Sequence, residues 1–184
     1  MEGFLVSAGV VALAEIGDKT QLLALLLTAR FRAPWPIVAG IFVATVANHA
    51  LASAVGVWLV GLIGPHVLRW ILGLSFIAMA AWTLIPDSAP DQEAARPRFG
   101  VFLTTVIAFF LVEMGDKTQI ATVALAAQFH SLVLVVLGTT VGMLLANVPV
   151  VFAGEALMKR VPLQWVRSVA ALSFAALGIY VLVA

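Results

Sequence analysis

One short stretch of the chain occurs twice and holds the residue types that could do chemistry. The heptapeptide EIGDKTQ at residues 15–21 returns 98 residues later as EMGDKTQ at residues 113–119. Each copy puts a glutamate, an aspartate and a lysine into a stretch otherwise built of Leu, Val, Ala, Ile and Phe. At the centre of a membrane helix each such charge costs about 2.5–3.5 kcal/mol on insertion scales. We therefore expect the two copies to face one another, compensated by partners, water or an ion.

The side chains of the two copies offer oxygen ligands for a cation. If the copies converge, the carboxylates of Glu15, Asp18, Glu113 and Asp116 stand against two lysines, a surplus of two negative charges when all are ionised. A divalent cation would balance that surplus. Oxygen ligands without any cysteine favour Mn2+, Ca2+ or Mg2+ over Zn2+ or copper. An empty site is expected to hold protons that the metal must displace, which predicts proton-coupled exchange.

Four amide side chains are further candidate ligands. Gln21 and Gln119 continue the acidic row by one helical turn. Asn48 and Asn147 lie within other apolar stretches, where asparagine either lines a pathway or only joins helices. The 98-residue offset maps Asn147 onto His49, which is either a ligand or proton carrier or a histidine satisfied by a neighbouring helix.

The two lysines of the motif allow three interpretations. Lys19 and Lys117 could pair with the carboxylates, replace a cation in the empty site, or extend their amines to the membrane surface. Of these three interpretations we favour pairing with the carboxylates.

The composition determines the class of protein. Of 184 residues, 63% are hydrophobic and 10% charged, well above the roughly 45–50% apolar share of globular domains. The sequence therefore predicts an all-α integral membrane protein in contact with lipid. The length accommodates about six crossings of roughly 20 residues and leaves no room for a separate catalytic domain, so we expect neither an enzyme nor a protein with a bound cofactor. No basic tract indicates nucleic-acid binding.

Six transmembrane helices are expected, in two groups of three. A polar segment at residues 87–98 divides a first repeat, residues 1–86, from a second, residues 99–184. The spans are expected at about residues 3–28, 37–63, 67–85, 99–128, 131–156 and 163–183.

The distribution of basic residues predicts the orientation, because lysine and arginine near span ends stay in the cytoplasm. One side holds only Arg69, and the other holds Arg30, Arg32, Arg96, Arg98, Lys159, Arg160 and Arg167. The segment 87–98 is therefore predicted cytoplasmic and both termini external. Because three spans are an odd number, the second repeat enters the membrane from the opposite side. Such inverted repeats, with sites near the midplane, are typical of secondary transporters.

The doubled Glu-x-Gly-Asp-Lys-Thr motif resembles that of the Gdt-type transporters, uncharacterised protein family 0016, over essentially the whole chain. That family includes MneA-type bacterial manganese exporters and Golgi Ca2+/Mn2+ proton exchangers. The resemblance implies a six-helix inverted-repeat exchanger of the lysine-exporter superfamily whose four acidic residues bind the cation. It also implies a plasma-membrane (inner-membrane) exporter that lowers cytoplasmic Mn2+, in the minimal prokaryotic form without the extensions of eukaryotic members.

Three other functions are alternatives to this one. An amino-acid exporter is suggested by the wider superfamily, and a cation channel is compatible with the same carboxylates. An intramembrane aspartyl protease would need a Gly-x-Gly-Asp form, whereas each copy here has glutamate three positions before the aspartate. The sequence leaves a homodimer open.

Overall fold

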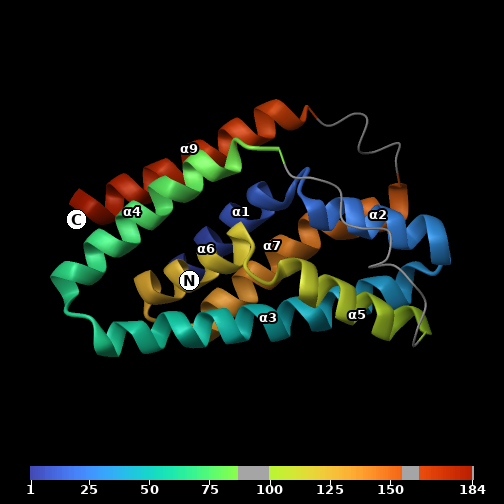
Figure 1. Ribbon diagram of the computed structural model, residues 1–184, viewed down its shortest axis with the longest axis horizontal. Helices are drawn as coiled ribbons and strands as arrows, with labels where there is room; N and C mark the ends of the chain where they lie inside the picture. Colours follow the sequence, from blue (N-terminus) through green and yellow to red (C-terminus); the bar gives the residue numbers. More distant parts are fainter. Residues whose placement is uncertain (87–99, 155–161, 184) are drawn as a thin grey trace.

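The computed structural model describes residues 1–86, 100–154 and 162–183, which form helices and no strand (Figure 1). The predicted linker 87–98 lies outside these ranges. The described helices are α1 (Glu2–Glu15), α2 (Lys19–Phe31), α3 (Pro34–Leu62), α4 (Pro65–Thr83), α5 (Gly100–Glu113), α6 (Lys117–Phe129), α7 (Leu132–Ala153) and α9 (Leu163–Val183).

The repeat of the sequence recurs in the backbone. Helices α5, α6, α7 and α9 begin 98 residues after α1, α2, α3 and α4, respectively. Helices α5 and α6 also end 98 residues after α1 and α2. Even the caps agree, because Arg32 after α2 and His130 after α6 both adopt the left-handed conformation with φ of 50°. Two sequences that match only in part thus fold into equivalent sets of helices.

Four of the described helices, α3, α4, α7 and α9, are long and apolar enough to cross a membrane. The other two predicted spans, residues 3–28 and 99–128, are not continuous helices, so this part of the prediction was wrong. Each is divided within its motif, into α1 and α2 or into α5 and α6. The 14 residues of α1 extend about 21 Å at 1.5 Å per residue, less than the roughly 30 Å of a hydrocarbon core.

A glycine with a positive φ divides each of these spans. Gly17 has φ of +82° and Gly115 has φ of +75°, a conformation that residues with a Cβ atom rarely adopt. The chain therefore leaves the α-helical region at these positions and starts a new helix at Lys19 or Lys117.

Helix α3 shows the reversed polarity expected of a helix between lipid and a polar interior. Its buried side includes the polar residues Thr45, Asn48, His49 and Ser53. Its exposed side carries the apolar residues Leu51, Val55, Trp58 and Leu62. Water would oppose this distribution, whereas hydrocarbon accommodates the apolar side without penalty.

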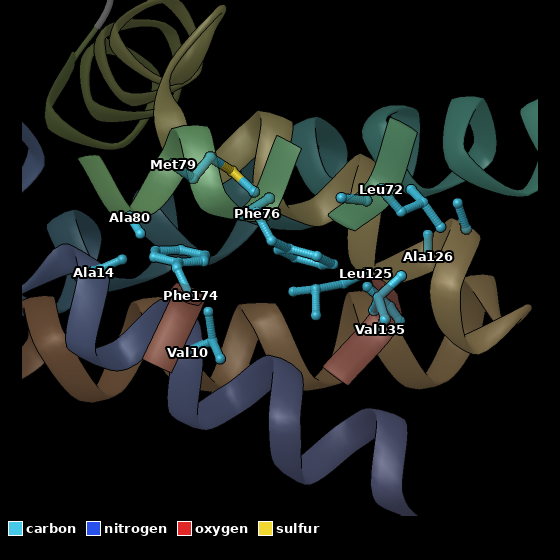
Figure 2. Close-up of a cluster of buried hydrophobic side chains, with 14 of the residues drawn as sticks. Val10, Ala14, Leu72, Phe76, Met79, Ala80, Leu125, Ala126, Val135 and Phe174 are labelled. Carbon is cyan, nitrogen blue, oxygen red and sulfur yellow. The ribbon is translucent and has the colours of Figure 1, made fainter. Parts of the chain in front are cut away.

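Helices α4 and α9 run side by side and pack on α1 and α6 (Figure 1). Figure 2 shows Phe76 of α4 beside Phe174 of α9, with Val10 of α1 and Leu125 of α6 in the same cluster. The two phenylalanine rings stack with centroids 6.5 Å apart. Phe174 is the repeat counterpart of Phe76, so equivalent residues of the two halves meet at this contact.

The long helix of each half packs on the first helix of the other half, α3 on α5 and α7 on α1. A Cβ atom on Gly40 of α3 would come within 3.0 Å of the carbonyl oxygen of Phe102 in α5. On Gly138 of α7 it would meet the carbonyl oxygen of Phe4 in α1. Because both contacts lie at equivalent positions, the small residues permit the same close helix approach in both halves.

Candidate metal centre

The two helix breaks lie toward the middle of the molecule and position the acidic side chains (Figure 1). Glu15 is the last residue of α1 and Glu113 the last of α5, whereas Asp18 and Asp116 are the N-caps of α2 and α6. The predicted continuous row of ligands along one helix is therefore replaced by two helix ends in each half. Helix C-termini carry partial negative charge, so the ends of α1 and α5 favour a cation between them.

Three of the four predicted carboxylates converge. Glu15, Glu113 and Asp116 are all buried, and each offers a carboxylate oxygen within 4.8 Å of those of the other two. Because two ligand atoms on one Ca2+ or Mg2+ ion, each about 2.0–2.6 Å from it, lie at most about 5 Å apart, the cluster is compact enough for a single ion.

Threonine hydroxyls hold one oxygen of each glutamate. Thr20 donates a hydrogen bond to Glu15 Oε2, and Thr118 donates to Glu113 Oε2 at 2.9 Å. The Oε1 atoms of both glutamates are buried and accept no hydrogen bond from any described residue. Each glutamate is thus oriented through one oxygen, and the other remains available for an ion or a proton. The sequence indicated this role only weakly, because threonine in a helix often bonds its own backbone.

The lysines cross between the halves. Lys19 Nζ lies 3.1 Å from Asp116 Oδ1, and Lys117 Nζ lies 2.7 Å from Asp18 Oδ1. Neither aspartate makes a side-chain cap hydrogen bond to its own helix, although aspartate often does at this position. The structure thus has the lysines pairing with carboxylates of the opposite half. Asp18, the fourth predicted carboxylate, lies in one of these ion pairs rather than in the three-carboxylate cluster.

The two glutamines of the motif hold the backbone of the breaks. Gln21 Oε1 accepts from the amide of Gly17 at 2.8 Å, and Gln119 Oε1 accepts from that of Gly115 at 2.7 Å. The amide groups of these glutamines donate to the opposite half as well. Gln21 Nε2 donates to the carbonyl of Ala146 at 2.6 Å, and Gln119 Nε2 donates to Asn48 Oδ1 at 2.6 Å.

Of the two asparagines, Asn48 is therefore engaged with Gln119, whereas Asn147 keeps one atom available. Asn147 Nδ2 donates to the carbonyl of Met143 at 3.1 Å, and its buried Oδ1 has no hydrogen-bond partner among the described residues. The two asparagines are fully buried.

Comparison with known proteins identifies the family of the chain. The family described as divalent cation/proton antiporter GDT1 matches residues 3–91 and 101–184 of the chain. A protein of Vibrio cholerae serotype O1 with the name "Putative manganese exporter" is 53% identical over 167 residues, which cover 90% of this chain and 83% of that protein. No solved structure matches the chain. With its long apolar helices, the chain is a multi-pass membrane transporter and a member of the GDT1 family of divalent cation/proton antiporters.

Proposed function

We propose that the chain exports Mn2+ across the inner membrane in exchange for protons and holds one ion between its two motifs. The observation that carries this proposal is the buried cluster of Glu15, Glu113 and Asp116, which joins carboxylates of both halves. The name of the Vibrio cholerae relative supports Mn2+ as the exported ion. Ca2+ is the second substrate that the same oxygen ligands would accept.

The free Oε1 atoms of the two glutamates and a carboxylate oxygen of Asp116 form the primary ligand set. In this proposal Asn147 Oδ1, which has no hydrogen-bond partner among the described residues, is an additional oxygen ligand. Gln21, Gln119 and Asn48 keep the breaks in shape rather than coordinate the ion, because their amides already bond the protein.

When no metal is bound, the two lysines pair with the two aspartates, and the two glutamates are left to hold protons. Lys19 competes with the ion for Asp116, and Lys117 neutralises Asp18 nearby. A metal that enters must displace protons from the buried glutamates, because adjacent ionised carboxylates in a site without a metal repel one another strongly. Release of these protons to one side and of the metal to the other constitutes the exchange.

The topology of the proposal is the inverted one. Helices α1 and α2 together form one crossing, as do α5 and α6, which gives six crossings in two oppositely oriented halves. The two breaks then lie near the midplane, where broken helices of secondary transporters bind their ions. Segment 87–98 is cytoplasmic, the termini are external, and the halves move relative to each other to open the site to one side at a time.

Transport by the purified chain in proteoliposomes tests the proposal. Vesicles with an acidic interior are expected to take up Mn2+, measured with a trapped dye, while their interior becomes alkaline. Substitution of each predicted acidic ligand by its amide should lower Mn2+ uptake at least about tenfold, since changes even beyond the direct ligands of a metal cost about 10–100-fold in affinity. The variants are Glu15→Gln, Asp18→Asn, Glu113→Gln and Asp116→Asn.

Glu2→Gln is the matched control, because Glu2 is exposed and is the one acidic residue of the described chain outside the motifs. It should transport as the unsubstituted chain does. Near-normal Mn2+ uptake by any two of the four acidic variants would reject a shared site. Mn2+ uptake that follows the membrane voltage and is not accompanied by proton movement would indicate a channel instead. Movement of amino acids in the absence of metal would indicate an amino-acid exporter.

A further inference from the structure

His49 of α3 lies beside the three-carboxylate cluster. Its side chain is fully buried, and Nε2 lies 3.9 Å from Glu113 Oε2. Neither ring nitrogen has a hydrogen-bond partner among the described residues. A buried imidazole is normally hydrogen-bonded, because an unpaired polar group in a low-dielectric interior is destabilising. This histidine therefore requires a partner that the described residues do not supply.

The other half has a different residue at this position. The repeat counterpart of His49 is Asn147, in the corresponding part of α7, and its Oδ1 is likewise buried without a hydrogen-bond partner. Both residues are on long helices that pack on the broken helices of the opposite half. The two equivalent positions thus offer imidazole nitrogens in one half and an amide oxygen in the other, none of them with a hydrogen-bond partner among the described residues.

We propose that Nε2 of His49 is a ligand of the transported ion and makes the site select Mn2+ over Ca2+. This inference rests on the proposed function of the site and adds the residue that determines its specificity. The distance of 3.9 Å between Nε2 and Glu113 Oε2 is compatible with two ligands of one ion, which lie at most about 5 Å apart.

The chemical reason is the preference of the two metals. Ca2+ takes oxygen ligands almost exclusively, whereas imidazole nitrogen binds first-row transition metals. A site that is otherwise all oxygen would hold both ions, and a single nitrogen strengthens Mn2+ relative to Ca2+. Both halves thus contribute carboxylates of the same type, whereas the difference between His49 and Asn147 determines the selectivity.

The decisive variant is His49→Asn, which gives both halves asparagine at the equivalent position. We expect the ratio of Mn2+ to Ca2+ transport in proteoliposomes to fall at least about tenfold, on the scale by which altered metal surroundings change affinity, while Ca2+ transport persists. His66→Asn is the matched control, because His66 is exposed at the start of α4. That variant should keep the ratio of the unsubstituted chain.

Pulsed electron paramagnetic resonance on the unsubstituted chain provides a second readout that needs no variant. Mn2+ bound to the purified protein should show hyperfine coupling to an imidazole nitrogen. This coupling should change from that of nitrogen-14 to that of nitrogen-15 when histidine is labelled with nitrogen-15. If His49→Asn does not fold, this measurement decides alone.

The outcomes separate this inference from the proposed function. If the unsubstituted chain moves neither Mn2+ nor Ca2+, the proposed function fails and this inference fails with it. If it moves both ions, but Mn2+ shows no histidine nitrogen coupling, or His49→Asn leaves the transport ratio unchanged, His49 is not a ligand and only this inference is overturned.

Discussion

At the level of single residues, two ion pairs join the halves, and each pair links residues that lie far apart in the sequence. The two pairs are equivalent in the repeat but differ in exposure. Lys117 is buried beside Asp18, whereas the Lys19 side chain, which pairs with Asp116, is 26% exposed. Buried ion pairs depend on both partners, because a charge left alone in a low-dielectric interior is strongly unfavourable.

We predict that Lys117→Gln destabilises the protein by about 3–5 kcal/mol, since it removes the close ion-pair partner of the buried Asp18. Lys19→Gln, the matched variant, should destabilise less, because water reaches that lysine. Denaturant unfolding in detergent micelles measures the difference. Combining Lys117→Gln with Asp18→Asn should recover most of the stability, and equal losses for the two lysine variants would contradict this interpretation.

At the level of helices, the breaks within the two motifs create the site. A continuous helix would place Glu15 and Asp18 on adjacent positions of one face. The break instead puts Glu15 at the end of α1 and turns Asp18 toward the opposite half. The glycines differ in their surroundings, because a Cβ atom on Gly17 would come within 2.7 Å of Leu163 Cδ2, whereas around Gly115 there is open space.

We predict that Gly17→Ala and Gly115→Ala both destabilise, by about 1 kcal/mol or more each from the positive φ alone. Gly17→Ala should be worse because of the contact with Leu163. Leu163→Ala in the same chain should restore part of the loss for Gly17→Ala and none for Gly115→Ala. Gly9→Ala is the control, because that position in α1 has open space and a helical backbone. Thermal unfolding in detergent distinguishes these cases.

At the level of the whole molecule, the two motifs are covered unequally. The start of α9 lies over the first motif, where Leu163 is next to Gly17. In the second motif Met114 is 56% exposed and Gly115 is exposed. Under the proposed function, such inequality between equivalent halves is what a carrier requires when its site is accessible from one side.

The predicted orientation can be tested with single cysteines, because the chain has none of its own. We expect Glu2→Cys to react with an impermeant thiol reagent in intact cells. Gln92→Cys, in the segment predicted cytoplasmic, should react only after the membrane is permeabilised. Labelling of Gln92→Cys from outside would show that the orientation is the reverse of the predicted one, and the assignment of export would then be wrong.

The amino-acid sequence alone predicts the class of protein, the internal repeat and the acidic residues of the two motifs. Apolar composition requires a membrane protein, and buried charges that recur in two halves are stable only where they can meet. The family assignment from the doubled motif was confirmed. These conclusions depend on composition and on the spacing of residues along the chain, both of which are properties of the sequence alone.

Which of these side chains contact one another depends on how the helices of the two halves pack. Pairing of Lys117 with Asp18, the Gln119 bond to Asn48, and the position of His49 beside Glu113 all join residues far apart in the sequence. The sequence also left open whether Gly17 and Gly115 permit a close approach of two helices or a local break, because glycine is tolerated in both situations. Helix packing selects between these states, and packing between the halves cannot be read from either half alone.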